Sequence, residues 1–188
     1  ISKSPGIYKI IIIRRSKDNQ EGIDYKRKVI ATYYPHSDSD IRILMPEIIE
    51  ICNATNSRAY IDVTPIDLEK VVFSTIKSLL TMQQEKNYNS LFKVVNHSAG
   101  IRTNHSERKF MFDIDSKDEN QLCEIIRMLN FTDPGSSNQL LLPTVQGYHL
   151  VVPVFDRIKF YENFNKSNIG FDEPEVKDIP TVLLYCNK

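Results

Sequence analysis

The stretch KFMFDIDSKDEN, residues 109–120, places two aspartates, Asp113 and Asp115, at the end of an apolar run. The run predicts a buried strand, and side chains two residues apart on a strand point to the same face, with Cα atoms about 6.5–7 Å apart. Carboxylates in this arrangement can converge on one or two cations, and hard oxygen ligands select Mg²⁺ or Mn²⁺. The pattern therefore predicts a site for two divalent ions that activate an attacking oxygen and stabilise a leaving one.

A purely structural interpretation of the same residues stays open. Acidic and hydroxyl side chains before a helix favour its dipole and cap its first turn, which accounts for Asp115 or Ser116. It does not account for Asp113, which stands between Phe112 and Ile114 in a strand that otherwise has a buried pattern.

A second polar group stands in the apolar stretch LLLPTVQGYHLVVPVF. His149 follows Gly147 by two residues, and a histidine here is either a core or edge residue of a strand or a phosphate ligand. In the functional interpretation Gly147 lets the backbone approach a ligand closely, and Thr144 or Gln146 offers polar contacts.

Length, charge and cysteine usage limit the classes of protein. The chain has 188 residues, 24 basic and 24 acidic side chains, and three cysteines without paired spacing. Scattered cysteines argue against a disulfide framework or a zinc site and favour a reducing cytoplasm. No segment approaches the roughly 20 apolar residues that cross a bilayer, so we expect no membrane contact. Zero net charge argues modestly against strong stand-alone nucleic-acid binding, although a basic group lies within residues 9–28.

Alternating apolar patterns and helical spacing predict an α+β protein with helices packed on one or two sheets. The apolar side chains of the helix at 66–84, from Leu68 to Leu80, are expected to share one face. A helix within 37–55 is expected to begin near Pro46 or to kink there, and a capping box from Ser116 to Glu119 is expected to start another. The strands are predicted at 7–15, 26–35, 57–65, 108–115, two within 140–155, and 181–186, with helices also at 116–131 and 156–165.

Taken together, FMFDID and, about thirty residues later, TVQGYHLVV resemble motifs of the archaeo-eukaryotic primase superfamily. The segments SRAYIDVTP, KFMFDID, GYHLVVPVFD and KDIPTVLLY look most like those of stand-alone primase-like proteins of bacteriophages. The resemblance covers most of the chain, although only the DxD and GYH segments are chemically specific. It implies a primase-like fold, with a sheet similar to the RNA-recognition motif in residues 86–188 and a smaller α/β unit in residues 1–85.

The resemblance also implies roles for individual residues. Asp113 and Asp115 match the metal-binding pair, and His149 matches the histidine that contacts the phosphates of the incoming nucleotide. The family's third acid normally ends a later strand, but here the last strand ends in LLYCNK. Asp156 is the best substitute for it, ahead of Asp178 and Asp62.

Four further residues complete the implied site. Thr144 or Gly147 stands near the family's small residue. Arg108 and Lys109 are placed to neutralise the triphosphate or the template.

The implied activity is template-directed nucleotidyl transfer in DNA replication, with nucleoside triphosphates as substrate and Mg²⁺ or Mn²⁺ as cofactor. The implied partners are a single-stranded DNA template, lying on the basic early strands with Tyr33 and Tyr34, and a replication helicase. A bacterial host cytoplasm is the expected location. Two rivals stay open: a metal-dependent phosphodiesterase or nuclease, and a non-catalytic module that binds nucleic acid or a replication protein.

Overall fold

A computed structural model of the chain describes two compact units, and the α+β class is confirmed. The first unit combines residues 1–107 with 181–188, and the second spans Arg108–Pro180. This division differs from the expected boundary near residue 85. The helix at 94–100 packs on the helix at 68–85, and the final strand returns to pair in the first unit. The structure describes residues 6–16, 27–101, 108–135, 139–167 and 170–187.

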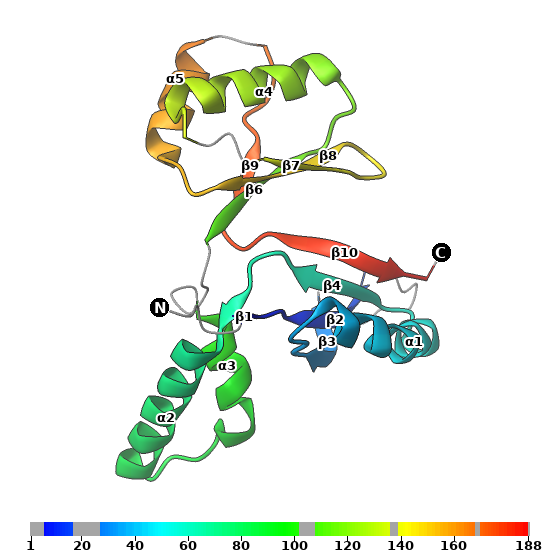
Figure 1. Cartoon of the computed structure of the whole chain (residues 1–188), viewed down its shortest axis with the longest axis vertical. Helices are drawn as coiled ribbons and strands as arrows, with labels where there is room; N and C mark the ends of the chain where they lie inside the picture. The colour runs from blue at the N-terminus through cyan, green and yellow to red at the C-terminus, as the bar shows by residue number, and fades with distance from the viewer. Residues whose placement is uncertain (1–5, 17–26, 102–107, 136–138, 168–169, 188) are drawn as a thin grey trace. The chain divides into compact units, whose positions relative to one another are not determined.

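The first unit is built on a four-stranded antiparallel sheet (Figure 1). Helix α1 lies on one face, where Ile48 and Cys52 pack against Ile10 and Ile12. The first two long strands of the chain pair antiparallel, as a hairpin. The strand order is β10 (Thr181–Cys186), β4 (Arg58–Asp62), β2 (Ile10–Arg15) and β3 (Arg27–Tyr33).

Helix α1 (Asp38–Thr55) begins well before Pro46, contrary to the expectation that this proline marks its start. Ser37 caps the helix, and its Oγ accepts a hydrogen bond from the Asp40 amide at 3.2 Å. Pro46 lies on the exposed side, so water can satisfy the carbonyl of Arg42 that loses its helical partner.

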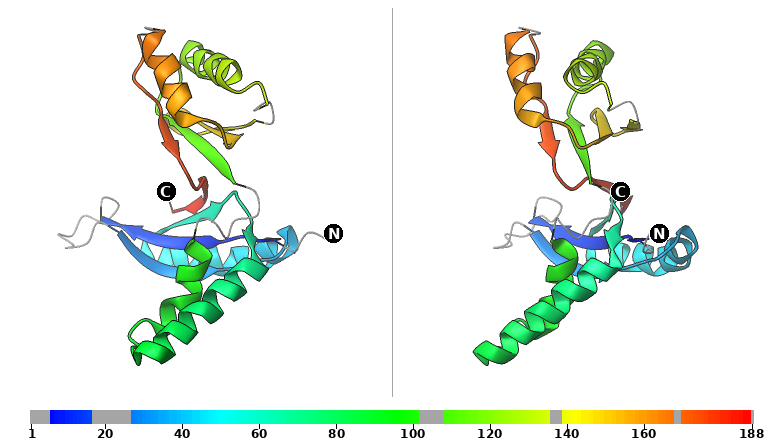
Figure 2. Two further views of the ribbon diagram at one scale, coloured as in Figure 1. Left: turned by 90° about the vertical axis from the view of Figure 1, so that its left-hand side faces the viewer. Right: turned by 60° about the vertical axis from the view of Figure 1, so that its left-hand side comes forward.

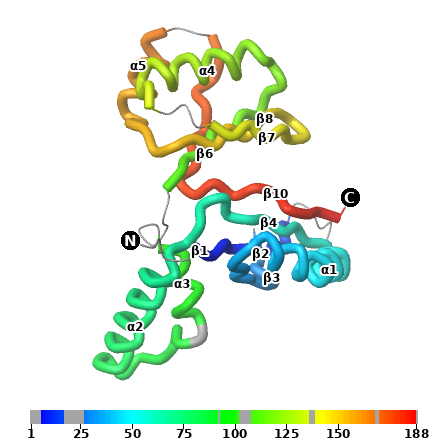
Figure 3. Tube along the Cα trace, in the orientation of Figure 1, coloured from blue at the N-terminus to red at the C-terminus, as the bar shows by residue number. Residues whose placement is uncertain are grey.

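A helical arm completes the first unit. Figures 1, 2 and 3 show α2 (Leu68–Glu85) and α3 (Val94–Gly100) lying side by side, after a short ribbon of β1 (Gly6–Ile7) and β5 (Ile66–Asp67). The 3₁₀ turn η2 (Leu91–Lys93) leads into α3.

The helix expected at 66–84 is confirmed as α2, and its apolar face is largely exposed. Val71 is the buried apolar residue of the helix, whereas Leu80 is 59% exposed. The helix instead turns small polar residues such as Ser74 and Ser78 toward its partly buried side. Within the described ranges, every helix is too short or too polar to span a bilayer.

The second unit has the chain order β6–α4–β7–β8–α5–β9. Its four strands form one antiparallel sheet in the order β7–β8–β6–β9, and both helices cover the same face (Figures 1 and 2). The elements are β6 (Lys109–Ile114), α4 (Glu119–Thr132), β7 (Leu140–Pro143), β8 (Tyr148–Pro153), α5 (Arg157–Lys166) and β9 (Glu175–Lys177).

Aromatic packing fixes the helices on this sheet. Phe112 of β6 stacks on Phe155, with ring centroids 5.4 Å apart, and lies 5.1 Å from Phe160 of α5. Phe110 and Ile114 point to the same side, so alternate residues of β6 enter the core. The remaining positions of β6, including Asp113, face the opposite side of the sheet.

Helix α4 begins three residues later than the expected capping box. Asp118 is its N-cap, with Oδ1 accepting from the Asn120 amide at 2.9 Å. The Ser116 Oγ accepts from the Asp118 amide at 3.1 Å, so it shapes the turn before the helix. The residues after β6 therefore form a separate turn between strand and helix.

One acidic residue of the first unit is buried. Asp62 ends β4, is 6% exposed, and its amide donates to the carbonyl of Lys9 at 2.9 Å. Burial raises the pKa of the Asp62 carboxyl to about 6, and the charge of Lys9 offsets only part of that rise. The folded protein therefore holds this proton more tightly than the unfolded chain.

The change Asp62→Asn tests this burial. Because the folded pKa lies above the ordinary value of about 4, the stability linked to protonated Asp62 is present below that pH and lost as pH rises through about 6. We expect the variant to exceed the wild type in unfolding free energy by roughly 1–2 kcal/mol at neutral pH, and to match it in acid. Urea unfolding followed by circular dichroism across this range measures the difference; a pH-independent difference would contradict it.

Candidate functional site

The open face of the second sheet carries one row of polar side chains across three adjacent strands. Asp113 of β6 lies directly opposite His149 of β8 on one side and Glu175 of β9 on the other. Residues in register across antiparallel strands point to the same face, with Cβ atoms about 4.5–5.5 Å apart. Three groups that are 26 to 62 residues apart in sequence therefore meet at one place.

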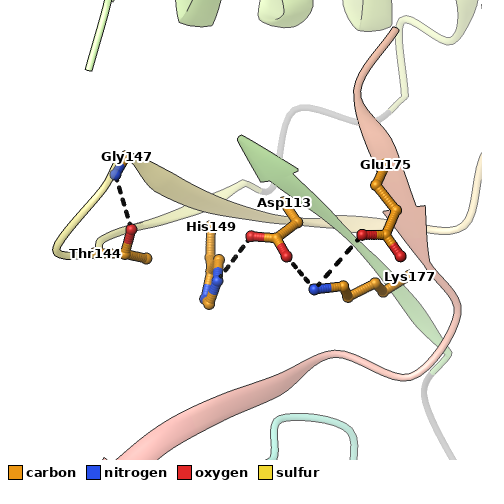
Figure 4. Close-up of polar contacts among 6 residues, drawn as sticks. All are labelled: Asp113, Thr144, Gly147, His149, Glu175 and Lys177. Carbon is orange, nitrogen blue, oxygen red and sulfur yellow. Dashed lines mark hydrogen bonds and ion pairs between the residues drawn. The ribbon is translucent and has the colours of Figure 1, made fainter. Parts of the chain in front are cut away.

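Asp113 is held by nitrogen groups on both carboxylate oxygens (Figure 4). The Nε2 of His149 lies 3.1 Å from Asp113 Oδ1, and the ammonium of Lys177 contacts Oδ2. The same ammonium lies 3.9 Å from Oε2 of Glu175. The Asp113 side chain is 20% exposed and that of Glu175 is 70% exposed, so the row is open to a ligand.

Asp115 lies one residue beyond the end of β6, whereas the sequence pattern predicted that the strand would extend to it. It lines a cavity of about 470 Å³ together with Glu175. Asp172 and Glu173 also line this cavity, which makes its wall strongly acidic. Glu175 therefore belongs both to the row of Asp113 and to the cavity of Asp115.

Gly147 is required by close packing of backbone. A Cβ at this position would lie 1.9 Å from the carbonyl oxygen of Ile114 and 2.6 Å from the amide nitrogen of Ser116. The glycine thus seats the β7–β8 turn on the chain segment that carries Asp115. This packing accounts for a glycine at position 147, and the expectation that Gly147 lets the backbone approach a ligand stays a prediction.

Thr144 closes the same turn. Its Oγ1 accepts from the Gly147 amide at 2.9 Å, and its own amide donates to the Gly147 carbonyl at 2.8 Å (Figure 4). Both polar groups of Thr144 are therefore used to shape the hairpin that leads into His149.

Three predicted residues lie at the other end of the strand pair. Pro153 pairs with Lys109, four residues or about 13 Å along the strand from the row of Asp113. Asp156 follows Pro153 and caps α5, with Oδ1 accepting from the Lys159 amide at 3.1 Å. Arg108 precedes Lys109, so the structure does not bring Asp156, Arg108 or Lys109 to the carboxylates.

The weaker candidates for a third acid are also placed elsewhere. Asp178 pairs with Arg157, with Oδ1 and Nη1 3.0 Å apart. Asp62 belongs to the first unit. The two tyrosines expected to stack on template are engaged inside the first unit, where the Tyr33 hydroxyl donates to Glu47 at 2.7 Å and the Tyr34 hydroxyl donates to Asn96 at 2.6 Å.

Two site residues, Glu175 and Lys177, were missed from the sequence. They lie on β9, a strand of three residues preceded by Pro174 and followed by Pro180. Three residues are too few to show the apolar–polar alternation that identifies a strand, and the nearby prolines are more typical of a loop. An acidic residue two positions before a lysine in an otherwise polar segment was the available signal.

The donor set suits a divalent ion, although the side chains do not enclose one as they stand. Among the described residues, no three His, Cys, Asp or Glu side chains gather closely enough to hold a metal ion. The ammonium of Lys177 contacts Asp113 and lies 3.9 Å from Oε2 of Glu175, so a cationic side chain stands between these two carboxylates.

The change Gly147→Ala should disrupt the turn that supports the site. The added methyl group meets main-chain atoms that cannot rotate away, so we expect a loss of about 2–3 kcal/mol in unfolding free energy. Gly100→Ala is the matched control, because a Cβ there meets nothing within 4 Å. Equal unfolding free energies for the two variants, measured in urea, would contradict the close approach.

Comparison with known proteins gives the chain no family. No family model matches it, and no curated protein matches its sequence significantly.

Proposed function

We propose that the second unit is a metal-dependent nucleotidyl transferase that makes primers on a template from nucleoside triphosphates. The observation that carries the proposal is the row of His149, Asp113 and Glu175 in register on the open face of one sheet. Asp115 follows at the end of the same strand and shares a cavity with Glu175. These carboxylates and the histidine lie on the face opposite the helices, so the aromatic core on the other face does not account for them.

The architecture supports the proposal. The order β6–α4–β7–β8–α5–β9, with a sheet order of β7–β8–β6–β9, is the split βαβ arrangement shared by RNA-recognition-motif sheets. The resemblance of FMFDID and GYH to primase motifs predicts these two segments on neighbouring strands, and they do pair. The primase-like assignment of the fold is part of the same proposal.

Asp113, Asp115 and Glu175 are the residues that would hold divalent ions. Glu175 takes the place that the sequence had given to Asp156, because it alone of the two lies beside Asp113. Bound Mg²⁺ or Mn²⁺ supplies activation of an attacking hydroxyl and neutralisation of a leaving pyrophosphate.

The neighbouring nitrogen groups would bind the substrate. The imidazole of His149 and the ammonium of Lys177 both stand at the row, and each offers N–H donors to phosphate oxygens. Charge-assisted bonds of this kind position a triphosphate against the carboxylates.

A single-stranded DNA template is assigned to the first unit. The end of the β2–β3 hairpin pairs Arg14 with Lys28 and Arg15 with Arg27, which gathers positive charge on neighbouring strands. Phosphate neutralisation by such groups gives salt-dependent affinity without sequence preference. A replication helicase as partner follows from the primase resemblance.

Substitution of the carboxylates tests the assignment. We expect Asp113→Asn to abolish Mn²⁺-dependent primer synthesis and Glu175→Gln to lower its rate by 10²-fold or more, on the order of a lost charge-stabilising group. Asp156→Asn is the matched control, because asparagine also caps a helix and the residue lies at the far end of the strand pair. Synthesis is measured by incorporation of labelled nucleotide on single-stranded DNA. Activity retained in Asp113→Asn would remove the site from the mechanism.

The same assay separates the rival functions. A nuclease or phosphodiesterase would shorten labelled DNA without added triphosphate and would lose this activity in the same variants. A non-catalytic binding module would show neither synthesis nor cleavage. Its binding of DNA would be unchanged by Asp113→Asn.

A further inference from the structure

Lys177 lies beside the row and carries a positive charge, so it competes with a metal ion for the same carboxylates. Lys177 is in register with Met111, two residues along β6 from Asp113. Its side chain reaches diagonally to the Asp113 carboxylate (Figure 4). Its ammonium contacts Oδ2 of Asp113 and lies 3.9 Å from Oε2 of Glu175. One cation therefore bridges carboxylates from two adjacent strands.

The pair of carboxylates needs such a cation. Like charges directly opposite each other on paired strands destabilise the pairing. In the described sheet, β9 is an edge strand of three residues whose ladder partner is β6, so the repulsion between Asp113 and Glu175 falls on a short stretch of pairing. The Lys177 ammonium turns the repulsion between Asp113 and Glu175 into two attractive contacts.

We propose that Lys177 is a built-in counter-ion that keeps the acidic pair assembled without metal, and that a metal ion must displace it. This inference rests on the proposed metal-dependent function. Moving the ammonium off two carboxylates costs free energy, which lowers the affinity of the site for metal alone. A triphosphate gives the displaced ammonium new oxygen partners, so Lys177 couples metal binding to the arrival of the nucleotide.

Calorimetric titration of Mn²⁺ into the full chain measures the effect without any need for activity. We expect Lys177→Met to bind Mn²⁺ on the order of tenfold more tightly than the wild type, because a competing charge near 4 Å is removed. Lys177→Arg keeps the charge and should stay near the wild-type affinity. Lys166→Met, which removes an exposed lysine from the last turn of α5, is the matched control and should change nothing.

A second titration includes a nucleoside triphosphate with a non-hydrolysable α,β linkage. In the wild type this ligand should raise the affinity for Mn²⁺. In Lys177→Met the gain should be several-fold smaller, because the site starts without the resident cation. Lys177→Gln retains a polar end group and replaces the Met variant if that variant does not fold.

The outcomes distinguish this inference from the proposed function. Mn²⁺ binding by the wild type with equal or weaker binding by Lys177→Met would overturn the counter-ion role and leave the metal site standing. Absence of Mn²⁺ binding in both proteins, with and without nucleotide, would overturn both. Tighter binding with a reduced nucleotide gain would support both.

Discussion

The alternation of side chains along β6 is the constraint on which the second unit depends. Phe110, Phe112 and Ile114 enter the core beneath α4 and α5, and this alternation leaves Asp113 on the opposite face. A shift of one residue in register would bury the carboxylate and expose three large apolar side chains. The core that stabilises the unit therefore also sets the direction of the candidate catalytic group.

Close packing of backbone against the end of β6 also fixes the turns around the site. Gly147 seats the β7–β8 turn against Ile114 and Ser116, and Thr144 closes that turn with two hydrogen bonds. The position of Asp115, just past the strand end, thus depends on a neighbouring hairpin as well as on its own strand. Gly147 therefore acts as a packing element next to the chain segment that carries Asp115.

Charge balance explains why the row can exist in a small sheet. Asp113 and Glu175 face each other on paired strands, and His149 and Lys177 supply the nitrogen groups that accompany them. The first unit shows the opposite arrangement at Asp62, where burial raises the pKa to about 6 and no ligand-facing role is evident among the described contacts.

Local pattern in the sequence determined the long helices, the long strands and the chemistry of Asp113 and His149, because periodicity and residue type are properties of neighbouring residues. Tertiary structure alone decided which groups meet. Strand β9 is too short to be read, so Glu175 and Lys177 entered the site only through pairing with β6, while Asp156 was left as a helix cap. The register between strands that are distant in the chain is set by packing of the whole sheet, so it cannot be predicted from the residues of one strand.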